Sequence, residues 1–220
     1  MAELQTADFV AHMNHRKVYR NTIARMFDHP LLEVASHVHP AVPLLVFAPI
    51  VAWFTYQSAL VASAPVVLAG LALGGLAWTL AEYTLHRFLF HFPDGNAVGR
   101  FVYFYTHGIH HDYPDDPTRL VMTPVLSVPL AVLFYVGFGL VFPAHWVSAA
   151  FAGFVLGYLA YDYAHYATHH LRAPSHPALG WLAAIMKEQR RRHMVHHFKR
   201  SDGGYGVSTS LWDRVFGTTV

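Results

Sequence analysis

The sequence predicts an all-α integral membrane protein, with four transmembrane helices in two hairpins and a cytoplasmic helical cap that holds a histidine-rich dimetal site. Three observations lead to this fold. Hydrophobic residues make up 54% of the 220-residue chain and charged residues only 13%, about half the charged share of ordinary soluble domains. Residues 41–81 and 120–161 form two runs without Asp, Glu, Lys or Arg. Histidines cluster tightly just outside these runs.

Residues 1–40 precede the first run and are expected to form an interfacial or cytoplasmic segment, separate from a membrane domain at 41–220. The segment has no apolar core of a signal peptide. Basic and apolar side chains alternate in it, which fits an amphipathic helix on the membrane surface and equally a loosely ordered basic tail. Its basic residues are Arg16, Lys17, Arg20 and Arg25.

Each apolar run is long enough for two membrane spans, because a bilayer core of about 30 Å needs about 20 helical residues. Turn-forming residues lie near the middle of each run: Ser63 and Pro65 in the first, Pro143 in the second. We therefore expect spans at residues 41–61, 64–85, 123–142 and 146–168.

Charge sets the expected orientation. All fifteen Lys and Arg residues lie before the first span, in the 82–119 connection or after the last span. The positive-inside rule places these three regions in the cytoplasm, together with all the histidine clusters. The sequence thus predicts a multi-pass protein of the bacterial inner membrane or the endoplasmic reticulum, with its active site on the cytoplasmic face.

Ten histidines are candidate metal ligands. Imidazole binds iron, copper and zinc well, and ten ligands exceed the four of a structural zinc site and suit two ions with open positions. The alternative, ten hydrogen-bonded imidazoles buried at a membrane edge without a metal, would be energetically costly. The ten are His86, His91, His107, His110, His111, His165, His169, His193, His196 and His197.

Helical spacing predicts how these side chains converge. Residues three and four apart share a helix face, so each H-x-x-H-H triplet, at 107–111 and at 193–197, is expected to point into one site. His165 and His169 also share a face, whereas His170 points away. His86 and His91 are five apart, a wider fork that reaches two different ions if the helix bends between them.

A weak repeat suggests two halves that each supply about half of the site. In each half an acidic-Tyr step, Glu82-Tyr83 or Asp162-Tyr163, precedes the first histidine, and a triplet follows. Carboxylates near the ligands are expected to orient the imidazoles and offset the metal charge, although Asp115 and Asp116 fit a solvated turn better. The candidates are Glu82, Asp112, Asp115, Asp116 and Asp162.

Several classes of protein are disfavoured. The chain has no cysteine, which excludes disulfides, zinc ribbons and cysteine-bound iron–sulfur clusters. It has no H-E-x-x-H string, as a membrane metalloprotease would require. The apolar runs lack the ionisable residues of a metal transporter. A net charge of +2 without a nucleic-acid motif gives no reason to expect a nucleic-acid partner.

Four stretches of the chain resemble the fatty acid hydroxylase/sterol desaturase superfamily of membrane di-iron enzymes, and the fatty acid 2-hydroxylases most of all. The resemblance runs from about Leu31 to Thr218 and includes an R-L-V extension at 119–121 and a tail ending in L-W-D at 211–213. The stretches are EYTLHRFLFHF at 82–92, THGIHHDYPDDPTRLVMTP at 106–124, GYLAYDYAHYATHH at 157–170 and RRHMVHHFKRSDGGYGVSTSLWDRVFGT at 191–218.

The resemblance implies hydroxylation of an acyl chain at carbon 2, using O₂ and two electrons. The ten histidines fall on the family's ligand positions for two iron ions, which zinc can replace in purified protein, and the catalytic candidates Tyr161 and Asp162 fall where residues near the substrate are expected. The 40 residues before the first span are too short for the haem electron-carrier domain of many eukaryotic members, so a separate electron-donor protein is expected. The acyl carrier is a free fatty acid, a sphingolipid or another amide-linked lipid. Alternatives are a lipid or sterol desaturase, a carotenoid hydroxylase, and a membrane metal-binding or electron-transfer protein without oxygenase activity.

Overall fold

A computed structural model describes residues 18–20, 22–23, 25–92 and 95–220, and every regular element within them is a helix. The amphipathic helix expected in the N-terminal segment falls partly on residues 1–17, outside the described residues, and the described residues between 18 and 29 form no helix. The described part of that segment contains one short helix, α2 (Pro30–Ser36).

Four long helices form a bundle: α3 (Val42–Val61), α4 (Ala64–Thr84), α7 (Pro124–Val141) and α8 (Ala144–His170). Each is long and apolar enough to cross a membrane, and the second span continues through a π-helix, η1 (Leu85–Phe90). The four predicted spans are therefore confirmed, with boundaries within two residues of the α-helical ends. The protein is a multi-pass membrane protein.

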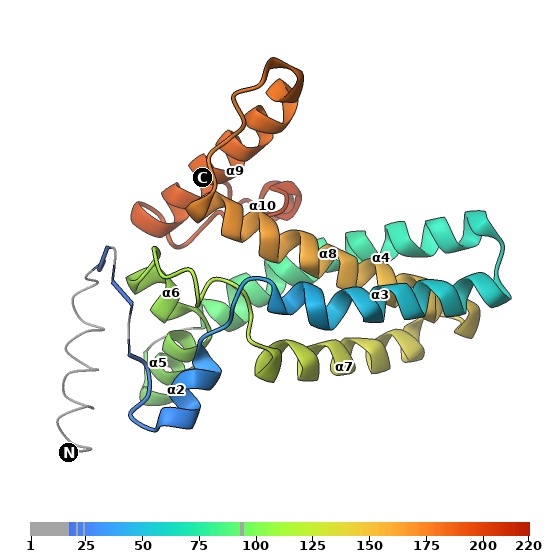
Figure 1. The fold of residues 1–220 in the computed structure, drawn as a ribbon, viewed down its shortest axis with the longest axis horizontal. Coiled ribbons are helices and arrows are strands. Elements are labelled where there is room, and N and C mark those ends of the chain that lie inside the picture. Colours follow the sequence, from blue (N-terminus) through green and yellow to red (C-terminus); the bar gives the residue numbers. More distant parts are fainter. Residues whose placement is uncertain (1–17, 21, 24, 93–94) are drawn as a thin grey trace.

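The connections within each pair of long helices are very short. Ala62 and Ser63 separate α3 from α4, and Phe142 and Pro143 separate α7 from α8. Pro65 lies in the first turn of α4, where its missing N–H has no helical acceptor to lose. Figure 1 places both connections at the end of the bundle away from α9.

Helix α8 is the centre of the bundle and packs chiefly against α4 and α3, with a smaller contact to α7. Small residues allow α4 and α8 to approach closely, as is common between membrane helices. A Cβ atom at Gly74 would overlap the carbonyl oxygen of Ala150, and one at Gly153 would overlap that of Leu71. Tight contact of α4 with α8 fixes the second and fourth spans relative to each other.

Aromatic side chains fill the bundle between α3, α4 and α8. Phe47, Trp78, Phe154 and Tyr158 belong to one buried cluster, in which the Trp78 and Tyr158 rings lie 5.3 Å apart between centroids. Helix α7 presents leucines and valines outward; Leu140, for example, is 84% exposed. In a membrane protein such side chains contact lipid.

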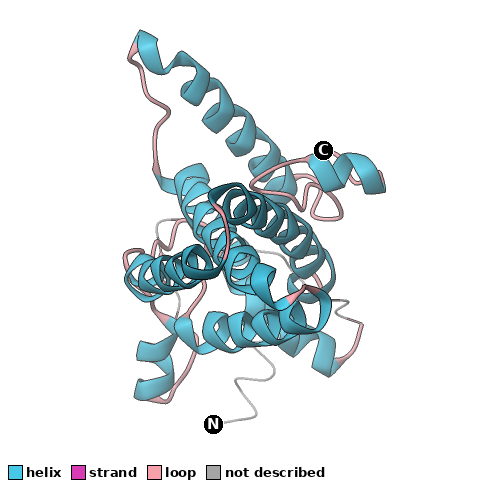
Figure 2. Cartoon of the chain, turned by 90° about the vertical axis from the view of Figure 1, so that its right-hand side faces the viewer, coloured by secondary structure: helices cyan, strands magenta, loops and turns pink. Residues whose placement is uncertain are grey.

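The remaining helices gather at one end of the bundle, which we call the histidine end (Figure 1). Figure 2, a view along the bundle, shows α9 reaching outward from it. Helix α8 has 27 residues and is about 40 Å long, so its last turns extend past a hydrocarbon core of about 30 Å. The other elements at this end are α5 (Ala97–Tyr103), the π-helix η2 (Phe104–Gly108), α6 (Ile109–Asp112), the 3₁₀ turn η3 (Pro177–Leu179), α9 (Gly180–Phe198) and α10 (Leu211–Phe216).

The α4–α8 contact predicts a difference between two glycines. We expect Gly74→Val to lower stability by about 1–3 kcal/mol, since overpacking forces the two backbones apart. Gly137→Val on α7 should change stability little, because a Cβ there meets no atom within 4 Å. Thermal unfolding in detergent, followed by tryptophan fluorescence, measures both. Equal melting temperatures for the two variants would contradict the close packing.

Candidate metal centre

The ten predicted histidines converge at the histidine end as two sets of five. Within each set, one ring nitrogen per residue lies within 4.8 Å of all the others. Set 1 consists of His86, His91, His107, His111 and His196, and set 2 of His110, His165, His169, His193 and His197. All ten candidates are therefore brought together, in the number expected for two ions.

A π-helix brings His86 and His91 into the same set. Helix η1 spans Leu85–Phe90, and the N–H of His91 donates to the carbonyl of His86 at 3.0 Å. This five-residue bond widens the helical turn, so residues five apart share a face. The expectation that this pair reaches two different ions is thus corrected: both imidazoles belong to set 1.

Each H-x-x-H-H triplet serves both sets. In the first triplet His107 and His111 join set 1 while His110 joins set 2; in the second, His193 and His197 join set 2 while His196 joins set 1. Each triplet points into the one ten-histidine centre, as its spacing predicts, and its members divide between the two sets because the i+3 side chain lies to one side of the i, i+4 row. Each chain half supplies four ligands to its own set and one to the other, which supports the two-half arrangement.

The nitrogen contacts within set 2 suit a metal and do not suit a hydrogen-bond network. Nε2 of His193 lies 3.0, 2.9 and 3.0 Å from Nε2 of His165, His169 and His197 respectively. One imidazole nitrogen carries either a single proton or a single lone pair, so at most one of these contacts is a hydrogen bond. Lone pairs converging on a shared cation account for all of them.

Two ligands of set 1 are oriented by backbone carbonyls. Nδ1 of His86 donates to the carbonyl of Tyr205 at 2.6 Å, and Nδ1 of His196 donates to that of Gly203 at 2.7 Å. A proton on Nδ1 leaves the lone pair on Nε2, the nitrogen that faces the set. This arrangement is common for metal-binding histidines, because it fixes both tautomer and ring orientation.

Buried carboxylates hold the 203–208 loop that supplies these carbonyls. Glu82 accepts from the N–H groups of Val207 and Ser208 at 2.6 and 2.8 Å. Asp213 accepts from those of Tyr205 and Gly206 at 3.0 and 2.8 Å. Glu82 thus orients ligands through the loop rather than by direct contact. Asp213 was not predicted, although it ends the L-W-D string of the tail.

Gly204 allows this loop to pass close to the ligands. Its φ of 73° is in the left-handed region, and a Cβ there would overlap Val220 and lie 3.6 Å from the His196 Cβ. A larger residue would strain the backbone and displace the carbonyls on either side.

Burial favours the neutral imidazole at five of the seven candidate ligands that lie outside the membrane spans. There burial, with smaller contributions from neighbouring imidazoles, lowers the pKa well below its usual value. A neutral imidazole is the form that binds a metal. The five are His107, His110, His111, His193 and His197.

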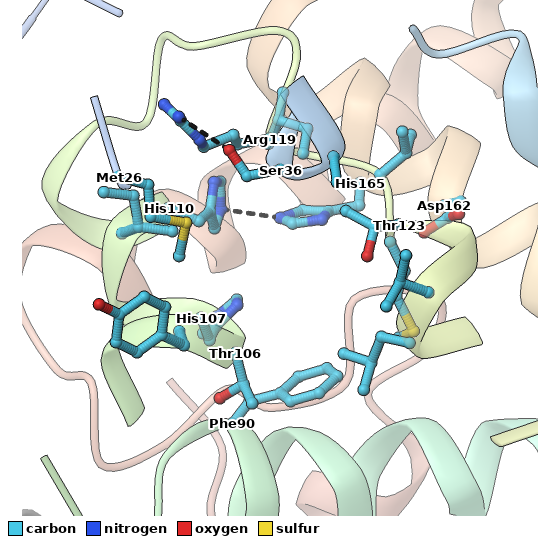
Figure 3. Close-up of a pocket in the computed structure, with 18 of the residues that line it drawn as sticks. Met26, Ser36, Phe90, Thr106, His107, His110, Arg119, Thr123, Asp162 and His165 are labelled. Carbon is cyan, nitrogen blue, oxygen red and sulfur yellow. Dashed lines mark hydrogen bonds between the residues drawn. The ribbon is translucent and has the colours of Figure 1, made fainter. Parts of the chain in front are cut away.

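A cavity of about 260 Å³ opens beside both sets. His107 of set 1 and His110 and His165 of set 2 line it, and Figure 3 shows these rings around its open space. The catalytic candidates Tyr161 and Asp162 also line it, and they are 5% and 1% exposed. Most other lining side chains are apolar, so the cavity suits a hydrocarbon chain.

Three predictions concern residues beside the sets. His145, His170 and His176 lie outside both sets, as expected for the lone histidines His145 and His176 and for His170. The solvated turn expected for Asp116 is wrong: its side chain is buried and pairs with Arg119 at 3.0 Å.

Comparisons with known proteins agree with this geometry. A family model described as Fatty acid hydroxylase matches residues 71–218. The chain is 41% identical over 149 residues to a ceramide very long chain fatty acid hydroxylase of Saccharomyces cerevisiae, covering 66% of this chain and 36% of that protein. It is 35% identical over 179 residues to a dihydroceramide fatty acyl 2-hydroxylase of Arabidopsis thaliana, covering 81% of this chain and 72% of that protein.

A solved structure is also similar. It is of full-length Scs7p with only the hydroxylase domain visible, and it superposes with a TM-score of 0.79 at 33% identity, covering 89% of this chain and 71% of that one. The chain spans 36% and 59% of the length of the yeast hydroxylase and of a second Arabidopsis dihydroceramide fatty acyl 2-hydroxylase.

His110 and His196, which each join the set formed mainly by the other half of the chain, predict how metal content responds to substitution. We call them the crossing histidines. We expect about two metal ions per chain in the wild type. Either His110→Ala or His196→Ala should lower this number, because each variant removes a ligand that one half of the chain contributes to the other set. His145 lies outside both sets, so the His145→Ala variant should retain about two metal ions per chain. Elemental analysis of protein reconstituted with iron makes the comparison. A single ion in the wild type, or unchanged content in both crossing variants, would reject the two-set arrangement.

Proposed function

Because this chain belongs to the fatty acid hydroxylase family, we propose that it is a di-iron monooxygenase acting on the 2-position of a fatty acyl chain. One oxygen atom of O₂ enters a C–H bond next to the acyl carbonyl. The other is reduced to water by two electrons and two protons. The single observation that carries this proposal is a largely apolar cavity bordered by ligands of both histidine sets.

Two iron ions held by the ten imidazoles would supply the activation of O₂ that an unactivated C–H bond requires. An all-imidazole set suits iron, and it also takes zinc readily. Protein purified without added iron can therefore carry zinc and be inactive.

The substrate class follows from the cavity and from the relatives. An acyl chain fits a narrow apolar space that begins at the membrane edge. The relatives are named as a fatty acid 2-hydroxylase, in the rat protein for example, and as hydroxylases of ceramide or dihydroceramide acyl chains. We propose the same acyl position here, on a free fatty acid, a sphingolipid or another amide-linked lipid.

Tyr161 and Asp162 are proposed to act at the reacting carbon. Both line the cavity, and the Tyr161 ring stacks on His165 with centroids 5.7 Å apart. A phenol is a hydrogen-bond donor, which suits the acyl carbonyl beside carbon 2. Asp162 lies one helical turn before His165 and would offset the positive charge of the centre.

We place the histidine end on the cytoplasmic face, where the positive-inside rule puts it, with α3–α4 and α7–α8 as hairpins. The electrons come from a separate donor protein. Exposed basic residues on α9, among them Lys187, Arg190 and Arg191, offer a docking face for an acidic partner and equally anchor this end to anionic headgroups.

Product analysis tests the reaction. Cells producing the wild type should contain acyl chains heavier by one oxygen at carbon 2, and His169→Ala should abolish this product. Asp162→Asn should retain its metal but lose about 10- to 100-fold in turnover, the usual effect of changing a residue that supports a metal ligand. Tandem mass spectrometry of lipids, with a matching reductase system supplied, locates the hydroxyl. A new double bond, or a hydroxyl in mid-chain, would assign the protein to another reaction of the superfamily.

Orientation is tested separately in this cysteine-free chain. Ser63→Cys, in the α3–α4 connection, should react with a membrane-impermeant maleimide only from outside the cytoplasm. Asp202→Cys, whose native side chain is 78% exposed near the histidine end, should react only from the cytoplasm. Labelling of both positions from the same side would contradict the hairpin arrangement.

A further inference from the structure

One wall of the cavity comes from the N-terminal segment. Met26, Phe27, Leu32, Ala35 and Ser36 all line it. These residues precede the region matched by the family model, which begins at residue 71. The metal centre is thus built from the family region, whereas this wall, residues 26–36, is contributed from outside it.

One carboxylate holds the wall in place. Oε2 of Glu33 accepts from the N–H groups of Met26 and Phe27, both at 2.8 Å. Its Oε1 accepts from Arg119 at 2.8 Å and contacts Nε2 of His37 at 2.9 Å. Burial opposes ionisation of Glu33, but these hydrogen bonds and the Arg119 charge outweigh it and lower its pKa to about 2. A single charged side chain therefore joins the segment before α2, α2 itself and the loop after α6.

The partner of Glu33 is rigidly held. The Arg119 side chain is 3% exposed and also pairs with Asp116 at 3.0 Å. Asp116 in turn accepts from the hydroxyl of Thr118 at 2.6 Å. Arg119 and Ser36 hydrogen-bond at 3.2 Å and form a polar edge of the cavity, visible in Figure 3. Without Glu33 this buried guanidinium would lose a carboxylate partner.

The wall also borders an opening of the cavity. Leu32 on α2 and Val125 at the start of α7 both line it, yet they are 53% and 74% exposed. Val125 lies in the first turn of a membrane span, so this opening faces the bilayer surface. A lipid chain entering there passes between the wall and α7 before it reaches His110 and His165.

We propose that Glu33 is a positioning residue for the acyl substrate: it fixes residues 26–36 as a wall that the acyl chain contacts on its way to the metal centre. This inference rests on the proposed function for the identity of the chain as an acyl group. The wall therefore takes part in selecting the lipid, which the ten histidines alone do not.

Kinetics of the full-length protein in nanodiscs test the position of the wall. Glu33→Ala should raise KM for the acyl lipid by about tenfold, as expected for a lost charge-assisted hydrogen bond, with kcat and metal per chain unchanged. Glu33→Gln keeps one acceptor oxygen, so its KM should lie between those of the wild type and Glu33→Ala. Glu188→Ala, which removes a carboxylate paired with Arg191 far from the cavity lining, is the matched control. An unchanged KM, or a parallel loss of metal and kcat, would overturn the proposal.

Thiol protection tests contact with the lipid without relying on turnover. Ala35→Cys lines the cavity, whereas Val34→Cys, its neighbour, is exposed and does not. A long-chain free fatty acid and a ceramide serve as separate probes. Slower maleimide labelling of Ala35→Cys, but not of Val34→Cys, with at least one probe supports the wall, and the effective probe identifies the carrier. Equal labelling with and without both probes would overturn it. Protection without hydroxylated product would refute the proposed function alone.

Discussion

The rest of the structure depends on the convergence of ten imidazoles on two points. At most one of the three close contacts around Nε2 of His193 is a hydrogen bond, and the others are repulsive unless a cation lies between the nitrogens. Local departures from regular structure serve this convergence: the π-turn that aligns His86 with His91, and the glycine-containing loop whose carbonyls face His86 and His196. Under the proposed function, metal binding and folding of the histidine end would therefore be coupled.

The membrane determines where this centre can form. Close packing of α4 against α8 brings the second and fourth spans together at the membrane edge, where each continues into ligand-bearing turns. The exchanged ligands His110 and His196 then tie the two chain halves to each other. The cavity borders both histidine sets and the start of α7, so under the proposed function a lipid would reach the histidines without leaving the apolar phase.

The four spans and the gathering of the ten histidines could be predicted, because they depend on composition and helical spacing along the chain. The assignment of ligands to sets could not. If a helix keeps 3.6 residues per turn, the five-residue interval between His86 and His91 predicts side chains on different faces unless the helix bends. The π-helix at Leu85–Phe90 removes this difference, and the sequence pattern alone does not indicate it. Arg119 pairs with Asp116 three residues earlier and also with Glu33 of α2, more than eighty residues earlier. Because the second contact is distant in the chain, the local sequence suggests only a solvated turn. Asp213, in the first turn of α10, accepts from backbone N–H groups of the preceding loop, and the sequence alone gives no signal for such contacts.

The most direct test of this account is an experimental structure of the iron-loaded protein with anomalous scattering measured at the iron edge. The account predicts two peaks. One is coordinated by His86, His91, His107, His111 and His196, and the other by His110, His165, His169, His193 and His197. A single peak, or two peaks in which each triplet stays with one ion, would contradict it.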